Sequence, residues 1–320
     1  MMDTKTRTKI QNKYYINAGR YKLNIKWILP LFIIMLLLSF YGVNYVRALT
    51  YENVYNNITE LSEQTTAQLN LAIAEQKRFI EIIIDSINSG FFDTPDDIFR
   101  RYNPDLSAYH FTRLVILDEN GNGITSDNHT IKNYNNIETY FAKAKDSVYL
   151  AENEPSVIYG SEKLVNVYAK TFTLKGKNLI LFATIHTEDY KEILLRQLFH
   201  GKGSTYLVNN DGLVLIDSSN NITTPNANFF QVLNESLSYD FDISKVDEMK
   251  QYMKAKQVGT FDLKLNKSTY FIHYEKVDTN DWYVITIAPD DTIAKELIQF
   301  LAIALVACIS ITFIIVGICI

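Results

Sequence analysis

Two long uncharged stretches near the ends of the chain constrain its fold more than any other feature. Ile28–Val46 holds nineteen consecutive residues without a charge, and Leu297–Ile320 holds twenty-four. A helix of about 20 apolar residues is long enough to cross the ~30 Å hydrocarbon core of a bilayer. The sequence therefore predicts one transmembrane helix at residues 28–46 and a second within residues 294–320.

A cleaved signal peptide is the alternative interpretation of the first stretch. The apolar part of a signal peptide is shorter, about 7–15 residues, and it ends at a cleavage site with small side chains. Here Tyr45, Arg47 and Tyr51 follow the apolar residues instead. We therefore expect an uncleaved membrane anchor.

The charges beside the first stretch predict the orientation of the chain. Residues 1–26 carry seven Lys or Arg and a single acid, Asp3. Positive residues next to a span are retained on the cytoplasmic side of the membrane. We therefore expect residues 1–27 to be a cytoplasmic basic tail. Residues 47–296 would lie outside the cytoplasm of a two-pass protein in a bacterial inner or cytoplasmic membrane, with the lipid bilayer as a partner.

The segment between the two stretches contains no thiol. The only cysteines, Cys308 and Cys319, both lie in the second stretch. The external segment must therefore fold around its core without disulfides. Outside the basic tail, acidic residues outnumber basic ones. This charge balance argues against a nucleic-acid partner, because phosphate binding needs clustered cations.

A long helix is predicted to continue from the first span over residues 47–90. Neither Gly nor Pro occurs between Val43 and Ser89, and a mostly apolar stripe recurs every three or four positions from Val54 to Ile87, interrupted by the polar residues Thr65 and Gln76. This stripe must pack on the following domain. We also expect part of this stripe to contact a second subunit. A homodimer would then form through the long helix and the membrane spans.

A second, short helix is predicted after Gly90. Thr94 is followed by Pro95, Asp96 and Asp97. A capping hydroxyl, a proline in the first turn and acids at the positive end of the helix dipole together mark a helix start. We expect this helix to end near Tyr102.

An internal repeat divides the rest of the external segment into two modules. Val115–Gly121 aligns with Tyr206–Gly212 without a gap, and both read as a strand followed by a turn. Each copy precedes a polar helical stretch and then two strand runs: Leu164–Phe172 with Asn178–His186, and Thr269–Val277 with Asp281–Ala288. The fold class predicted is α+β, with one antiparallel sheet per module. Glu188–Phe199 would be a joining helix.

The order of these elements resembles that of double-Cache (dCache) extracytoplasmic sensor domains, over roughly residues 45–293. Asn135–Phe141 looks like the family's "dRxYF" segment, and Tyr270–Ile287 is similar to its closing "yyvsy…gWylv" hairpin. The resemblance implies tandem PAS-like Cache modules on a long N-terminal helix, flanked by two transmembrane helices. Residues 91–200 would form the membrane-distal module and residues 201–293 the membrane-proximal one.

The same resemblance implies a sensor in signal transduction that binds a small-molecule ligand in the distal module and passes the signal through the membrane helices to a cytoplasmic output domain. Sensors of this arrangement often precede a diguanylate cyclase; a histidine kinase or a chemoreceptor is the alternative output. No such domain follows in the sequence, which ends at Ile320 within the second stretch. We interpret the chain as a truncated receptor.

The chain departs from the family's amino-acid-binding pattern, which needs Arg and Trp on the pocket helix and Asp on the last distal strand. Glu138 and Thr139 stand where the Arg is expected, no Trp follows, and Thr184 takes the Asp position. We therefore do not expect an amino-acid ligand, and the identity of the small molecule stays open. The candidate ligand contacts are Arg113, Tyr140, Tyr149, Tyr159, Tyr168, Thr184 and His186.

Each tyrosine in this set has a plainer interpretation as a half-buried strand residue, because the chain holds 21 Tyr. Thr184 and His186 are expected on one face of their strand by period-two alternation.

No motif predicts catalysis, a cofactor or a metal site in this chain. Asp118–Gly123 matches the start of a calcium-binding loop, but His129 stands where the loop requires a bidentate Glu, so we interpret it as a turn. The phosphate-binding and nucleophile motifs GxxxxGK[ST], GxGxxG and GxSxG do not occur. We therefore expect no enzyme activity from this chain, although a full-length parent would be an enzyme if it carried a cyclase domain.

Two other functions remain open from the sequence. The chain would be a complete membrane-anchored binding or structural subunit, acting with a protein partner, if the coding sequence stops at Ile320. A surface hydrolase would require a cleft that gathers a nucleophile, a base and oxyanion donors.

Overall fold

The structure is a computed structural model. It describes residues 25–156, 160–194, 203–218, 227–236, 243–265 and 268–289, with short helical pieces at residues 299–300, 302–304, 306–308 and 310–311. The chain divides into two compact units. One unit is formed by residues 57–289, and the other by residues 1–56 with residues 290–320.

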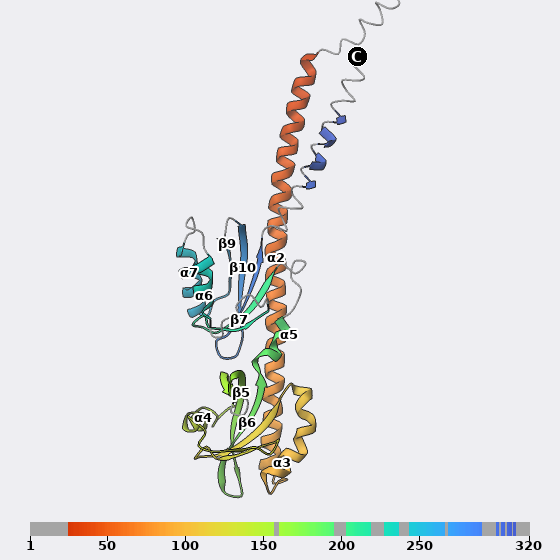
Figure 1. The fold of residues 1–320 in the computed structure, drawn as a ribbon. Helices are drawn as coiled ribbons and strands as arrows, with labels where there is room; N and C mark the ends of the chain where they lie inside the picture. The colour runs from red at the N-terminus through yellow and green to blue at the C-terminus, as the bar shows by residue number, and fades with distance from the viewer. Residues whose placement is uncertain are drawn as a thin grey trace, which may run out of the picture. The chain divides into compact units, whose positions relative to one another are not determined.

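A single long helix, α2 (Ile25–Asn88), begins in one unit and continues through the other (Figure 1). The helix predicted at residues 47–90 is therefore confirmed, and it is continuous with the apolar stretch before it. Gly90 ends the helix with a φ of 78°, and its N–H donates to the carbonyl oxygen of Ile87. Gly adopts this left-handed conformation without steric cost, which makes it the usual residue at a helix C-terminus.

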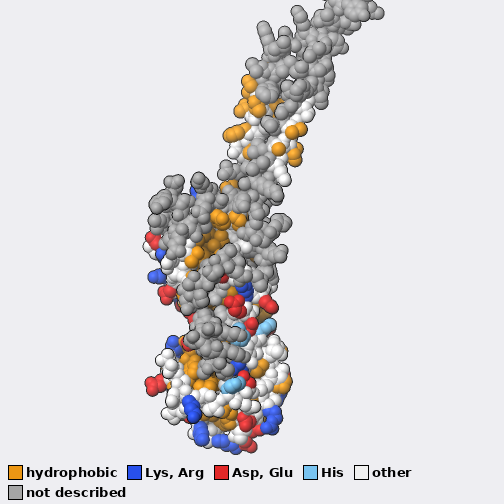
Figure 2. Space-filling view, viewed as in Figure 1, with side chains coloured by type: hydrophobic (Ala, Val, Ile, Leu, Met, Phe, Trp, Pro, Cys, Tyr) orange, Lys and Arg blue, Asp and Glu red, His pale blue; other side chains and the backbone are white. Residues whose placement is uncertain are grey.

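The N-terminal part of α2 has an exposed apolar surface, which Figure 2 shows as hydrophobic side chains along this stretch. By length and composition, α2 is the one helix among the described residues that could cross a membrane. Ser39 Oγ lies 3.4 Å from Cys308 Sγ, so the described piece around Cys308 contacts this stretch. The rest of the predicted second span lies mostly outside the described residues.

The first module contains one antiparallel sheet of six strands, here called sheet A. Its order is β3-β2-β1-β6-β5-β4, so the last hairpin pairs with the first strand. The strands are β1 (Arg113–Asp118), β2 (Gly123–Thr125), β3 (Thr130–Ile131), β4 (Tyr149–Ser156), β5 (Gly160–Leu174) and β6 (Lys177–His186). The single antiparallel sheet is as predicted, whereas β3 and β4 were not predicted from the sequence.

The second module repeats this arrangement in a five-stranded antiparallel sheet, sheet B. Its order is β8-β7-β11-β10-β9, in which the last hairpin again pairs with the first strand. The strands are β7 (Ser204–Val208), β8 (Val214–Asp217), β9 (Gly259–Leu265), β10 (Ser268–Lys276) and β11 (Tyr283–Pro289). Two helices, α6 (Phe229–Ser236) and α7 (Ile243–Lys254), lie on the side of the sheet away from α2 (Figure 1).

Short helices connect these elements in the first module. Helix α3 (Pro95–Tyr102) begins at a full capping box, in which Thr94 Oγ1 accepts from the N–H of Asp97 and Asp97 accepts from the N–H of Thr94. The predicted start and end of this helix are confirmed. The others are η1 (Asn103–Tyr109), α4 (Ile137–Lys143), η2 (Thr187–Tyr190) and α5 (Lys191–Leu194). The joining helix predicted at residues 188–199 corresponds to η2 and α5 as far as residue 194, and residues 195–200 lie outside the described residues.

The two faces of sheet A bury different partners. Leu114, Ile116, Leu181 and Ala183 belong to a core that also includes the apolar residues of α2. The alternate positions on the same strands belong to a second core that includes Ile137 and Tyr140 of α4. Sheet A is therefore a layer between α2 and α4, because successive strand residues point to opposite faces.

The internal repeat appears in the structure as the same turn in both modules. Asp118 Oδ1 accepts from the N–H groups of Asn120 and Asn122, and Asn209 Oδ1 accepts from those of Asp211 and Leu213. Gly121 and Gly212 follow at φ values of 73° and 83°. An Asx side chain that binds backbone amides two and four residues ahead stabilises a tight turn. The carboxylate of Asp118 therefore stabilises the turn by accepting backbone hydrogen bonds.

Candidate ligand-binding site

The α4 face of sheet A gathers most of the predicted site residues. Arg113 on β1 lies directly opposite Thr184 on β6, which in turn lies opposite Val167 on β5. Residues directly opposite each other in a sheet point to the same face. Because Val167 packs into the core that includes α4, the side chains of Arg113 and Thr184 belong to the α4 face. His186 lies opposite Val165 of the same core, so alternation places it on this face as well.

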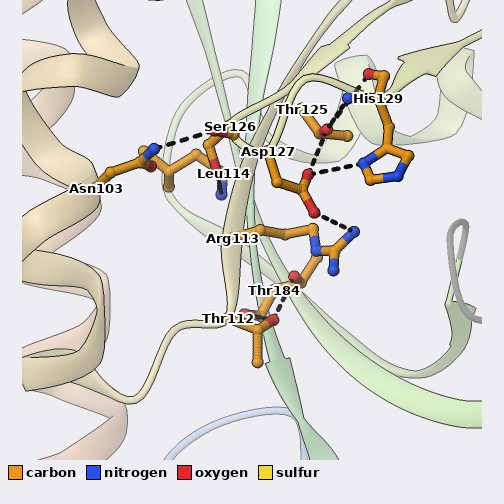
Figure 3. Close-up of polar contacts among 9 residues, drawn as sticks. All are labelled: Asn103, Thr112, Arg113, Leu114, Thr125, Ser126, Asp127, His129 and Thr184. Carbon is orange, nitrogen blue, oxygen red and sulfur yellow. Dashed lines mark hydrogen bonds and ion pairs between the residues drawn. The ribbon is translucent and has the colours of Figure 1, made fainter.

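A buried cation is the main polar feature of this face. The Arg113 side chain is 8% exposed, and its Nη1 lies 3.4 Å from Oδ2 of Asp127, whose side chain is 43% exposed. Figure 3 shows the carboxylate between the guanidinium and the ring of His129. Burying a charge is costly unless it is paired, so Asp127 is needed to keep Arg113 in this position.

The turn after β2 positions the Asp127 carboxylate. Thr125 Oγ1 donates to Asp127 Oδ1 at 2.6 Å, and His129 Nδ1 lies 3.3 Å from the same oxygen. Asn128 takes a φ of 65°, which closes the turn, and Thr125 Oγ1 accepts from the N–H of His129. Asn tolerates this left-handed conformation better than most residues.

The pKa of Asp127 reflects these contacts. Its partial burial alone would raise the pKa of the carboxyl group. The hydrogen bond from Thr125 and the nearby Arg113 and His129 outweigh burial and hold the pKa below its usual range. The carboxylate is therefore ionised at neutral pH, and the pair with Arg113 has no net charge.

Backbone contacts fix this turn against β1. The N–H of Ser126 donates to the carbonyl oxygen of Leu114, and Ser126 Oγ accepts from the N–H of Leu114. Asn103 Nδ2, from the start of η1, donates to the carbonyl oxygen of Ser126 (Figure 3). The neighbour of Asp127 is thus held on both sides, and Asp127 stays beside Arg113.

Thr184 makes a second polar contact at this end of the sheet. Its Oγ1 lies 2.9 Å from Thr112 Oγ1, and Thr112 Oγ1 also donates to the Thr184 carbonyl oxygen at 2.8 Å (Figure 3). Two hydroxyl groups and the guanidinium of Arg113 therefore lie at one end of β1 and β6. The guanidinium can donate hydrogen bonds to a ligand that carries an acceptor or an anionic group, whereas the two hydroxyl groups, whose protons are used in these contacts, can only accept.

An aromatic cluster lies beneath α4 on the same face. Tyr140 packs against Phe182 at a ring distance of 4.8 Å and against Tyr134 and Tyr149 at 5.9 Å each. The Tyr140 hydroxyl is buried beside the side chains of Tyr134 and Glu154. Burial, with the neighbouring Tyr134 and Glu154, raises the pKa of Tyr140 far above its usual value. Tyr140 therefore remains a neutral hydrogen-bond donor.

Tyr149 lies at the edge of this cluster, on β4. Lys143 Nζ donates to the Tyr149 hydroxyl at 3.1 Å and lies 4.9 Å from the centre of its ring. Tyr149 is half buried, as is Tyr134, whereas Tyr140 and Phe182 are buried.

Tyr168 lies on the opposite face of sheet A from Arg113 and Tyr140. Its hydroxyl donates to Gln76 Oε1 of α2 at 2.5 Å and lies 2.6 Å from the hydroxyl of Tyr190. Gln76 also accepts from Tyr190 at 2.7 Å and donates to the carbonyl oxygen of Tyr109 at 3.2 Å. The structure thus places Tyr168 in a buried network on α2. Tyr159 lies outside the described residues.

Three residues of this face were not among the candidates from the sequence: Asp127, Tyr134 and Phe182. Asp127 had a local signal, because Thr125-Ser-Asp-Asn-His129 is a polar turn directly after a strand that pairs with β1. Tyr134 and Phe182 had no separate signal, since their place beside Tyr140 depends on the register of β1, β6 and β5.

The α4 face therefore combines a polar end at Arg113 and Thr184 with an aromatic part around Tyr140. Such a combination is typical of small-molecule sites, where apolar side chains provide contact area and a few polar groups fix the orientation. Among the described residues, no three His, Cys, Asp or Glu side chains gather as a metal ion would require.

The fold is an α+β arrangement in which a long N-terminal helix is followed by two antiparallel sheets, and it is similar to that of solved sensory domains of receptors. The resemblance noted in the sequence is thus confirmed at the level of the fold. No protein-family model matches the sequence, and no protein of curated function matches it.

Solved structures with this fold include receptors of two kinds. The sensory domain of the Campylobacter jejuni chemoreceptor Tlp3 (CcmL), with isoleucine bound, has a TM-score of 0.55 and 17% identity, and the match covers 78% of this chain and 98% of that chain. The ligand-binding domain of the Pseudomonas aeruginosa PAO1 amino-acid chemoreceptor PctB, in complex with L-Arg, has a TM-score of 0.57 and 14% identity, with coverage of 76% and 97%. The extracellular domain of rpHK1S-Z16, described as a histidine kinase, has a TM-score of 0.53 and 16% identity, with coverage of 77% and 97%.

Proposed function

We propose that this chain is the sensory part of a transmembrane receptor and that it binds a small molecule on the α4 face of sheet A. The observation that carries the proposal is the pair of Arg113 and Thr184, which lie directly opposite each other and place a buried guanidinium beside a hydroxyl group on one face of the first sheet. The fold supports it, because the similar solved structures are sensory or ligand-binding domains of receptors.

The ligand we propose has an acceptor or anionic group for Arg113 and Thr184 and an apolar or aromatic part for the cluster around Tyr140. An α-amino acid, the ligand in the Tlp3 and PctB structures, fits this chain less well. Glu138 and Thr139 lie on α4 where the amino-acid pattern has Arg, and Thr184 replaces the Asp that would bind the ammonium group.

We propose a two-pass arrangement in a bacterial inner or cytoplasmic membrane, with the N-terminus in the cytoplasm. The uncharged N-terminal part of α2 and the stretch from residue 297 would be the spans, and the basic residues 1–26 support this orientation. Residues 47–296 would then be outside the cytoplasm. A homodimer would form through α2 and the spans.

The signal would reach an output domain that follows residue 320 in a longer chain. A diguanylate cyclase is our first choice of output, and a histidine kinase or a chemoreceptor is the second. This chain itself would then have no enzyme activity. The alternative is a membrane-anchored binding or structural subunit that acts with a protein partner.

A thermal-shift screen of the full chain in detergent micelles tests the sensing proposal. A compound that binds only the native state stabilises it by RT ln(1 + [L]/Kd), about 2.7 kcal/mol at a hundredfold excess over Kd. We expect at least one metabolite to raise the melting temperature of the wild type. A broad library without a single hit would contradict small-molecule sensing and favour the protein-partner alternative.

A further inference from the structure

The turn between β10 and β11 reaches from the second module into the first. Asn280 and Asp281, its two central residues, have φ values of 58° and 51°, and the N–H of Trp282 donates to the carbonyl oxygen of Thr279 at 3.3 Å. Two consecutive residues at positive φ form the tight hairpin turn whose twist matches that of the flanking strands. The turn is therefore a short, rigid projection from sheet B.

Strand β4 of sheet A receives this projection through Glu152. Trp282 Nε1 donates to Glu152 Oε2, and Asn209 Nδ2, from the turn between β7 and β8, donates to Glu152 Oε1 at 3.1 Å. Asn280 Nδ2 donates to the carbonyl oxygen of Leu150 at 2.7 Å. Both oxygens of one carboxylate on sheet A thus bind donors from sheet B.

Helix α2 holds the same turn from another side. The N–H of Asp278 donates to Asn70 Oδ1 at 3.0 Å, and Lys77 Nζ lies 3.5 Å from Thr279 Oγ1. Trp282 is fully buried and belongs to the same core as α2 and the inner face of sheet A. The turn therefore has defined contacts with α2 and with β4.

The positions of these residues along the chain connect the candidate site to the C-terminal stretch. Tyr149, in the aromatic cluster, lies three residues before Glu152 on β4. Strand β11 begins at Tyr283, directly after Trp282, and runs to Pro289. The residues after Pro289 lead into the stretch that we propose as the second span.

We propose that Glu152 is a positioning residue that couples sheet A to sheet B through Trp282 and Asn209. Hydrogen bonds to a carboxylate are strong and directional, so a shift of β4 must either carry the turn with it or break two charge-assisted bonds. A carboxylate that lost both donors at this partly buried position would be left without compensation. That a signal passes from a bound ligand to the membrane rests on the proposed function, whereas the coupling between the two sheets does not.

Amide hydrogen exchange of the full chain in detergent micelles tests the coupling without a ligand. Ile180→Ala removes a fully buried side chain from the α4 face of sheet A and so destabilises that sheet directly. With Glu152 in place, we expect this substitution to speed exchange of the β10 and β11 amides by about tenfold, because coupled elements open together. In a Glu152→Ala background, Ile180→Ala should speed exchange in sheet A only.

Glu188→Ala is the matched control, since Glu188 is an exposed carboxylate in η2 whose ion-pair partner, Lys191, is 3.9 Å away. It should leave the response of β10 and β11 to Ile180→Ala unchanged. An equal response of sheet B with Glu152 and with Ala at this position would overturn the proposal. So would the absence of any response in the chain that retains Glu152.

Glu152→Gln keeps the test decisive if the Ala variant does not fold. The amide keeps the size of the side chain but has one acceptor oxygen for two donors, so the response of sheet B should fall; an undiminished response would overturn the proposal. Trp27 and Trp282 are the only tryptophans. In a Trp27→Phe chain, the tryptophan fluorescence emission therefore comes from Trp282 alone. Ile180→Ala should change this emission when residue 152 is Glu and leave it unchanged in the Glu152→Gln variant. A failed ligand screen would leave this result standing.

Discussion

The buried guanidinium of Arg113 and the half-exposed carboxylate of Asp127 form an ion pair at 3.4 Å on the α4 face of sheet A. The two residues come from different elements, and the turn from Thr125 to His129 fixes the carboxylate. The pair keeps a cation buried on the face of the sheet that we propose as the ligand-binding face.

The pair predicts a pH dependence of stability. The folded-state pKa of Asp127 is depressed, so its contribution is present above the pKa of the unfolded chain and is lost as the pH falls through the folded pKa. At pH 7, Asp127→Asn should cost about 1–2 kcal/mol, since solvent screens the exposed side of the carboxylate and Arg113 stays buried. The difference between wild type and variant in the free energy of unfolding should shrink as the pH falls below about 4. A difference that stays constant from pH 7 to pH 3 would exclude this account.

The buried amide of Gln76 predicts a second effect on stability. Gln76→Leu removes an acceptor for Tyr168 and Tyr190 and a donor to Tyr109. We expect a loss of about 1–3 kcal/mol in denaturant unfolding, because these polar groups are buried. Gln68→Leu is the matched control on an exposed position of the same helix and should change stability by no more than about 0.5 kcal/mol. Equal losses of stability in Gln76→Leu and Gln68→Leu would show that the hydrogen bonds of Gln76 do not stabilise the fold.

Features that depend only on residues close together in the chain could be predicted from the sequence, whereas features that depend on distant residues could not. The cap at Thr94 and the turns that end in Gly121 and Gly212 involve neighbouring residues only, and the structure has them where the sequence predicts. Strand β4 was not predicted, because it lies at the sheet edge, contains Pro155 and pairs with β5 through two irregularities.

The candidate site depended on strand register, which the sequence does not specify. Tyr168 and Val167 are neighbours on β5, and only the pairing of Val167 with Thr184 decides that Tyr168 points to the other face. The polar turn from Thr125 to His129 could be recognised in the sequence, but the partner of Asp127, Arg113, lies on β1, and only the pairing of β1 with β2 brings the two residues together. One-residue alternation can be read from the sequence, whereas the alignment of strands to each other comes from the whole sheet.

Buried hydroxyl groups on α2 predict that some substitutions stabilise the chain. Ser62 Oγ is buried, and within the part of the chain that the structure describes it has no hydrogen-bond partner. Ser62→Ala should therefore be neutral or stabilising by up to about 1 kcal/mol. Ser86 is the control, because its Oγ accepts from the Tyr102 hydroxyl and donates to the Ile82 carbonyl oxygen. Ser86→Ala should lower the melting temperature, and the opposite order of the two variants would contradict this assignment.

Two glycines at positive φ, Gly212 in the turn between β7 and β8 and Gly176 in the turn between β5 and β6, predict unequal costs of substitution. Gly212 has a φ of 83°, and a Cβ there would lie 2.4 Å from Phe230 Cδ2; Gly176 has a φ of 77°, with nothing within 4 Å of a Cβ. Gly176→Ala should cost about 1–2 kcal/mol, the penalty of the left-handed conformation alone. Gly212→Ala should cost more, because Phe230 must also move. Chemical denaturation compares the two variants, and equal losses would show that Phe230 moves without cost.

The most direct test of ligand binding on the α4 face is calorimetric titration of the full chain with the compound that gives the largest thermal shift. Thr184→Asp places a carboxylate opposite Arg113. Thr173→Asp is the control, an exposed position on β5 of the same sheet. We predict that Thr184→Asp weakens binding by at least about tenfold, equivalent to about 1.4 kcal/mol, and that Thr173→Asp leaves the affinity unchanged. Equal affinities for wild type and Thr184→Asp would place the ligand elsewhere and contradict the account.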